Sequence, residues 1–341
     1  MAAQLNLSDP DRARQELDRA VDSQDAEKIA RAAMINIWPL LTDHTELLIS
    51  VVSGLPIPAL ERYPVLQMVH PMTAVLARTG RPFTPLIYSE NARQMSPEEV
   101  DFVVLTQIIA FRTSGDTEAA LRYAQRLSDR IRDVRHASRD RLDGPIWYFH
   151  HQIGSTHLAA GDFVRALLGL ATPRQLGKLS AQGDAERAVV GRIALAHAMR
   201  GSIAEAEREL SEAREMPEPT LAQASATIST ENTVAAFIAL ERMSDDLDEQ
   251  LATLSPYDSL DLAWPCVLLV RTRAHLARRR PHDALEASRL TRAAHPVQPR
   301  AFGGPVAAGA GAVFLAGEHH QRHALGLVAH GGVVDRHGFA G

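Results

Sequence analysis

Residues 112–127 read RTSGDTEAALRYAQRL, and this stretch decides the fold because it contains the end of one helix and the start of the next. Gly115 tolerates the left-handed backbone that a helix C-terminus needs, and Asp116 is then placed to cap the following helix. Ala120 and Ala124 continue at the spacing of one helical face. The stretch therefore predicts two helices joined by a tight turn.

The same pattern recurs along the chain at intervals of about forty residues, or about twice that. The recurring pairs are Gly115 with Ala120, Gly161 with Ala166, Gly201 with Ala206, and Arg279 with Ala284. Near residue 241 the expected copy lacks its glycine. Self-similarity at this period is typical of stacked helical hairpins. We expect an all-α fold, a superhelical array of antiparallel helix hairpins (a tetratricopeptide-like solenoid) over residues 1–295, with each repeated Ala where two helices approach most closely.

Local signals refine the expected helices. Ser202 and Glu205 have the spacing of a capping box, and Pro281 suits the first turn of a helix. Further helices are expected over about residues 25–41, 145–160 and 185–200, and from 260 to about 280.

Composition fits a helical globular chain and excludes several classes. Hydrophobic residues make up 45%, charged residues 23% and aromatic residues only 5% of the 341 positions. No run approaches the roughly 20 apolar residues of a membrane span, and the N-terminal residues lack the apolar core of a secretion signal. The single cysteine, Cys266, excludes an internal disulfide and fits a reducing cytoplasm. We read Cys266 as a buried small apolar residue, and a net charge of −5 predicts no direct DNA binding.

Residues 296–341 differ from the rest of the chain. They are rich in Gly and His and lack helix caps and a clear period. Two interpretations stay open: a flexible or poorly ordered irregular tail, or a segment out of register with the preceding sequence because of a shifted reading frame. We expect little packed structure after about residue 318, although a helix over 306–315 is compatible with the pattern.

Two segments carry a resemblance to a known family. LLISVVSGLPIPALERYPVLQMV (residues 47–69) resembles the Leu-Pro element in the helical-repeat region of large LuxR-type transcriptional regulators. FHHQIGSTHLAAGDFVRAL (149–167) and ALAHAMRGSIAEAERELSEA (194–213) are similar to the tetratricopeptide-like units that follow it there. The resemblance covers roughly residues 30–295 and implies a helical-repeat sensor region.

Full-length members of that family also carry a nucleotide-binding module and a C-terminal helix-turn-helix. Neither a phosphate-binding Gly-x4-Gly-Lys-Ser/Thr motif nor a basic recognition helix occurs here, so ATP hydrolysis and DNA binding are not carried over. The resemblance implies the sensor or scaffold portion of such a regulator, holding an effector or a protein partner. The alternative is a stand-alone tetratricopeptide-type adaptor. No catalytic motif or cofactor motif is present, and an enzyme is not expected.

One candidate binding surface lies in the helix expected over 145–160. Trp147, His150, His151 and His157 would hold an effector if the first helix of each hairpin lines the concave face. The structural alternative makes Trp147 a core residue and leaves the three histidines partly exposed.

Two further clusters carry weaker signals. Arg278, Arg279 and Arg280 could contact a phosphate-bearing ligand. His319, His320 and His323 could place two imidazoles on one helical face, but no carboxylate or cysteine completes a metal site. No metal or other cofactor is therefore assigned.

Overall fold

The computed structural model describes residues 10–63, 66, 97–113, 116–137, 146–179, 184–219, 221–254 and 264–294. Within these ranges all regular secondary structure is helical, and no strand occurs. This confirms the all-α class. The expected tail over 296–341, with its helix at 306–315, and Gly115 lie outside the described residues.

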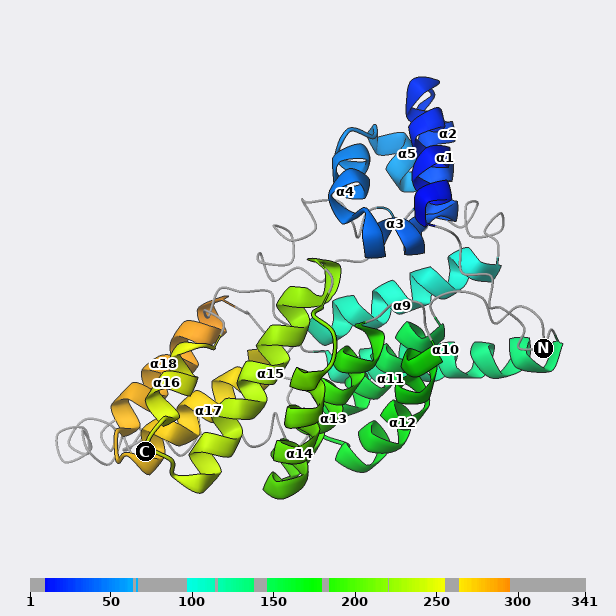
Figure 1. Ribbon diagram of the computed structural model, residues 1–341. Helices are drawn as coiled ribbons and strands as arrows, with labels where there is room; N and C mark the ends of the chain where they lie inside the picture. The colour runs from blue at the N-terminus through cyan, green and yellow to red at the C-terminus, as the bar shows by residue number, and fades with distance from the viewer. Residues whose placement is uncertain are drawn as a thin grey trace, which may run out of the picture.

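Five short helices come first: α1 (Pro10–Asp22), α2 (Ala26–Ile35), α3 (Ile37–Asp43), α4 (Thr45–Ser53) and α5 (Ile57–Arg62). Together they enclose an apolar core that includes Leu17, Leu40 and Leu48, all fully buried. Val103 of α9 (Pro97–Thr113) also belongs to this core, and α3 contacts α15 (Leu221–Arg242). The first group, blue in Figure 1, is therefore packed against the helices that follow.

The remaining helices follow one another in pairs. They are α9 with α10 (Thr117–Ala137), α11 (Ile146–Ala159) with α12 (Phe163–Leu179), α13 (Ala185–Arg200) with α14 (Ile203–Glu215), α15 with α16 (Leu247–Ala252), and α17 (Trp264–Ala277) with α18 (Pro281–Ala294). The two helices of each pair contact each other. We call α9, α11, α13, α15 and α17 the first helices, and their partners the second helices.

Contacts between pairs follow the order of the chain. Each first helix contacts the next first helix, from α9 through α11, α13 and α15 to α17. The second helices α10, α12 and α14 each contact the first helix of the next pair. In Figure 1 the pairs accordingly succeed one another from α9 and α10 on one side to α17 and α18 on the other.

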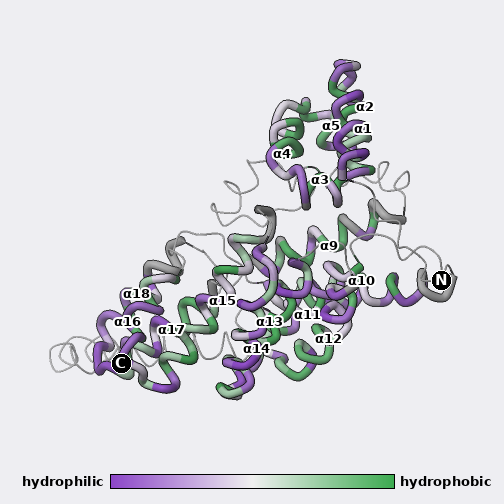
Figure 2. Tube along the Cα trace, viewed as in Figure 1, coloured by the Kyte–Doolittle hydropathy of each residue, from purple (hydrophilic) through white to green (hydrophobic). Residues whose placement is uncertain are grey.

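Hydropathy distinguishes the helices. The second helix α14 is mostly hydrophilic in Figure 2, as its sequence IAEAERELSEARE requires, and it buries only one side, which includes Ala206 and Leu210. The first helix α13 is buried on nearly every side. A helix covered all round must be surrounded by other elements, and α11, α12, α14 and α15 all contact α13.

The turns inside the pairs share one geometry. Gly161 and Gly201 have φ of 76° and 84°, and each donates its main-chain N–H to the carbonyl three residues earlier. The next residue in each case donates to the carbonyl five residues earlier. This pair of hydrogen bonds is the Schellman motif, which ends a helix with a residue in the left-handed region.

The same turn forms where the sequence has no glycine. Arg279 has φ 57°, which confirms that it stands in for the glycine. Met243 has φ 52° and makes the same two hydrogen bonds in the copy expected near residue 241. The second helix that follows Met243 is the short α16, so this copy is degenerate but present.

The repeated alanines are buried. Ala120 and Ala166 and Ala206 have no exposed area, and Ala284 is 3% exposed. The helices α11 and α12 also approach each other closely at two glycines. A Cβ added at Gly154 would lie 2.8 Å from Cγ of Leu170, and one added at Gly169 would lie 3.3 Å from Cα of Gly154.

Most expected boundaries hold, and two expectations were wrong. The helices over 146–159 and 185–200 are present. The helix expected over 25–41 is two helices, because Asn36 ends α2 and its side chain donates to Oε2 of Glu16 at 3.0 Å. Ser202 precedes α14 but makes no capping hydrogen bond through its side chain, so the capping box does not form.

Replacing Met243 with glycine should stabilise the protein. A side chain in the left-handed region costs about 1–2 kcal/mol, partly offset by the greater flexibility of glycine in the unfolded chain. We expect Met243→Gly to raise the free energy of unfolding by up to about 1 kcal/mol, measured by urea denaturation. The control, Gly201→Ala, should lower it, because Gly201 has φ 84°. A loss of stability in Met243→Gly would contradict the assigned turn.

Two glycines in helices should respond to alanine in opposite ways. A Cβ at Gly177 would lie 2.9 Å from the main-chain N of Glu186, which cannot move without shifting α13. A Cβ at Gly191 would meet only side-chain atoms, the nearest 3.8 Å away. We expect Gly177→Ala to lower the free energy of unfolding. Gly191→Ala should raise it by about 0.5–1 kcal/mol, because alanine has a higher helix propensity than glycine. Thermal denaturation measures both changes. Equal effects would contradict the close approach of α12 and α13.

Candidate functional site

Buried polar side chains are concentrated on the first helices. Among the described residues of α9–α18, the buried polar or charged residues on second helices are Glu209 and Ser288. The others within these helices lie on α9, α11, α13, α15 and α17. Buried polar groups cost stability unless they are hydrogen-bonded, so such a concentration needs an explanation other than packing.

The first polar cluster joins α9 to α11 through Arg112, which is 6% exposed. Its Nη1 donates to the main-chain O of Gln152 at 3.1 Å and to Oγ1 of Thr156 at 3.2 Å. Its Nη2 donates to Oε1 of Gln152 at 2.5 Å. All three acceptors are neutral, so this guanidinium is buried against hydrogen-bond acceptors without a carboxylate among them.

Arg192 of α13 brings a second guanidinium to the same region and is 7% exposed. Burial, and to a lesser extent the charge of Arg192, lower the pKa of Arg112 to about 9. Tyr148 of α11 lies close to both arginines, and burial raises the pKa of its hydroxyl above its ordinary value. Two buried guanidinium groups, those of Arg112 and Arg192, thus lie where α9, α11 and α13 meet.

His151 lies in the same region and is 5% exposed. Its ring is stacked on that of Trp147, with 6.0 Å between the centroids. Within the described part of the chain, neither Nδ1 nor Nε2 has a hydrogen-bond partner. Burial and then the charges of Arg192 and Arg112 hold the pKa of His151 well below its ordinary value, so its imidazole is neutral at pH 7.

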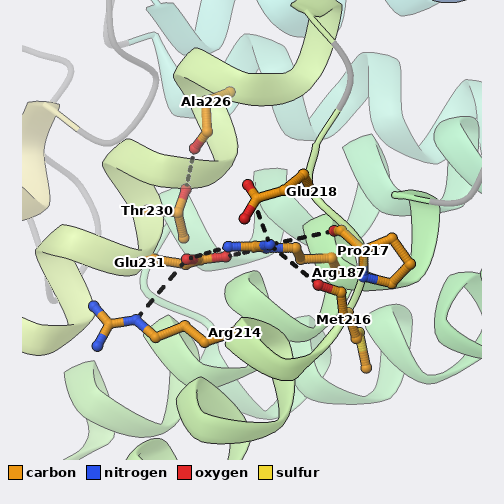
Figure 3. Close-up of polar contacts among 8 residues, drawn as sticks. All are labelled: Arg187, Arg214, Met216, Pro217, Glu218, Ala226, Thr230 and Glu231. Atoms are coloured by element: carbon orange, nitrogen blue, oxygen red, sulfur yellow. Dashed lines mark hydrogen bonds and ion pairs between the residues drawn. The ribbon is translucent and has the colours of Figure 1, made fainter.

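The second polar cluster joins α13 to α15 and is drawn in Figure 3. Arg187 donates from Nε to Oε1 of Glu231 at 2.8 Å and from Nη2 to Oε2 at 3.1 Å. Both side chains are buried, at 7% and 5% exposure. Nη1 of Arg187 also donates to the carbonyls of Met216 and Pro217, at 3.3 and 3.2 Å. One guanidinium therefore fixes α13, α15 and the connection after α14.

The structure separates the residues named from the sequence. Trp147 is buried in an apolar cluster with Leu170 and Val189, as the structural alternative expected. His151 is buried rather than partly exposed, whereas His150 and His157 are half-buried. His151 therefore belongs to the polar cluster, and Trp147 lines its apolar side.

The three arginines at the end of α17 do not join this region. Arg278 pairs with Asp248, with 2.5 Å between Nη1 and Oδ1, and Arg279 forms the turn. Arg280 is exposed. The histidines at 319, 320 and 323 lie outside the described residues, and in the described ranges no group of three metal-ligating side chains is close enough to hold an ion. Cys266 is buried, as expected.

Sequence reasoning missed Arg112, Gln152 and Arg192. A basic residue in the last turn of a helix usually faces solvent, where it interacts with the helix dipole, and Arg112 has that position in α9. The available signal was the strip on α11 formed by His151, Gln152, Ser155 and Thr156, since two pairs of polar residues one turn apart are unusual in a buried helix.

Comparison with protein-family models, with curated proteins and with solved structures gives no match. In the described part of the chain, the helices lack the length and apolar run needed to cross a bilayer. The function is therefore argued from the residues themselves.

Breaking the Arg187–Glu231 pair should be costly. Removing one partner of a buried ion pair leaves the other charge uncompensated, which costs about 3–5 kcal/mol. We expect this loss in the free energy of unfolding for Glu231→Gln. The control is Glu207→Gln, because Glu207 pairs with Arg242 on the surface at 51% and 52% exposure, where a pair contributes under about 1 kcal/mol. Similar losses in the two variants would contradict the buried pair.

Stability should fall as the pH falls below about 6.5. His151 binds a proton less readily in the folded protein, where Arg112, Arg192, Trp147 and Tyr148 surround it, than in the unfolded chain. The neutral form of His151 therefore favours the folded state at pH 7.5. This stabilisation is lost as the pH falls, because protons bind to His151 in the unfolded chain. Urea denaturation between pH 7.5 and 5.5 should show a flatter pH dependence for His151→Gln than for the wild type. The exposed His282→Gln should keep the wild-type slope.

Proposed function

We propose that this chain is a binding scaffold, a superhelical array of helix hairpins that holds an effector or a partner against its first helices. The observation that carries the proposal is the concentration of buried polar groups on α9, α11, α13 and α15. In helical-repeat arrays the stacked units form an extended concave surface used for binding. The chain-order contacts between pairs and the repeated left-handed turns support this architecture.

The resemblance to LuxR-type regulators makes a sensor the preferred form of this scaffold. A ligand that favours one curvature of the array would shift the population of its conformations and change what a linked or partner module does. Arg187 is well placed to transmit such a change, because it ties two first helices to the connection after α14.

A protein adaptor is the second candidate. Val164 and Leu168 lie one turn apart on α12 and are 60% and 71% exposed. Adjacent exposed apolar side chains are a feature of protein-binding surfaces. In this alternative the second helices, rather than the first, contact the partner.

Hydrogen exchange of the backbone tests the proposal. Candidate metabolites and peptides are first selected by their effect on the melting temperature, and exchange is then measured with and without each ligand. We expect protection to increase on α9, α11, α13 and α15. Protection centred on α12, lost in Val164→Ser with Leu168→Ser, would favour the adaptor. Turnover of a ligand instead of stoichiometric binding would contradict both.

A further inference from the structure

We infer that the polar cluster between α9, α11 and α13 is a binding site for the anionic group, phosphate or carboxylate, of an effector. The inference rests on the proposed scaffold function and specifies the chemistry of its ligand. Its basis is the set of donors that Arg112, His151 and Ser155 present in one buried region.

The donors come from adjacent positions. His151 and Ser155 are one turn apart on α11 and therefore share a face. Ser155 is 6% exposed, and its Oγ has no hydrogen-bond partner. Both ring nitrogens of His151 are likewise buried without a partner. A buried donor left unsatisfied destabilises the folded protein, so a ligand that accepts hydrogen bonds from these two side chains would remove that cost.

Charge determines the kind of ligand. The acceptors of Arg112 are the neutral oxygens of Gln152 and Thr156. After burial, the main influence on its pKa is a second guanidinium, that of Arg192, which lowers it. Positive charge at Arg112, with the neutral donors of His151 and Ser155 nearby, would stabilise an anion and would repel a cation.

The contacts of Arg112 leave part of its guanidinium available. Among the described residues, its two Nη atoms make three hydrogen bonds and Nε makes none. An arginine has five N–H donors in a planar fork that matches the two oxygens of a carboxylate or a phosphate. The bonds to Gln152 and Thr156 hold this fork in place, so its remaining donors are oriented before a ligand arrives.

The aromatic rings define the other side of the site. Trp147 stacks on His151, and Tyr148 meets the same ring edge-on with 6.1 Å between the centroids. These contacts fix the orientation of the imidazole without occupying its nitrogens. A neutral imidazole can donate one N–H to an anion.

Direct binding of two probes tests the inference: inorganic phosphate and acetate, each measured by equilibrium dialysis at constant ionic strength. We expect saturable binding of at least one of them, with one site per chain. The stronger probe identifies the group that the natural effector carries. The inference would be overturned if neither probe showed saturable binding at concentrations up to about 10 mM.

Variants separate this site from general surface attraction. Arg112→Gln and His151→Phe should weaken binding at least tenfold, since each removes donors and His151→Phe keeps an aromatic ring against Trp147. Arg126→Gln is the matched control because Arg126 is an exposed arginine of α10 that lies over the ring of Tyr123. Its affinity should equal that of the wild type. Equal affinity in all of these proteins would overturn the inference.

If circular dichroism shows that Arg112→Gln or His151→Phe does not fold, Ser155→Ala takes its place. It removes a single unpartnered Oγ and should weaken binding severalfold, whereas unchanged affinity would overturn the inference. A failure of the anion site can be distinguished from a failure of the scaffold proposal. A neutral ligand that protects the first helices, together with no anion binding, would retain the scaffold and reject the anion site.

Discussion

The left-handed residue that ends α11, α13, α15 and α17 is the constraint on which the other features depend. At Gly161, Gly201, Met243 and Arg279 the same two hydrogen bonds close the helix and reverse the chain. Because the geometry is shared, successive pairs present their first helices to one another in the same manner. The contacts from α9 through α17 follow from this repetition.

The buried polar side chains on the first helices form two clusters that differ in how their charge is balanced. Around Arg187 the charge is balanced by Glu231, and the remaining donors reach main-chain carbonyls. This cluster stabilises the junction of α13 and α15. Around Arg112 the acceptors are neutral, and His151 nearby has no partner at either nitrogen. The first cluster explains how neighbouring pairs are held together, whereas the second is the region where a ligand would supply the missing charge.

The sequence predicted the turns and helices well because their signals are local. A glycine followed five positions later by alanine marks a turn whatever packs on it, and even Arg279 was identified by its position in the repeat. Asn36 was missed because its hydrogen bond to Glu16 depends on packing between α1 and α2. The partners of Arg112 were missed for the same reason, since Gln152 and Thr156 lie forty or more residues away. Burial and pairing across helices are tertiary properties that periodicity does not contain.

Native-state hydrogen exchange of the protein without a ligand tests the central claim, that hairpins stack in chain order. In such an array each unit is stabilised mainly by its neighbours, so the free energy of opening should be highest in α13, which is covered on nearly every side. It should decrease towards α9 and α10 in one direction and α17 and α18 in the other. Equal opening free energies in all these helices, or the lowest value in α13, would contradict the account.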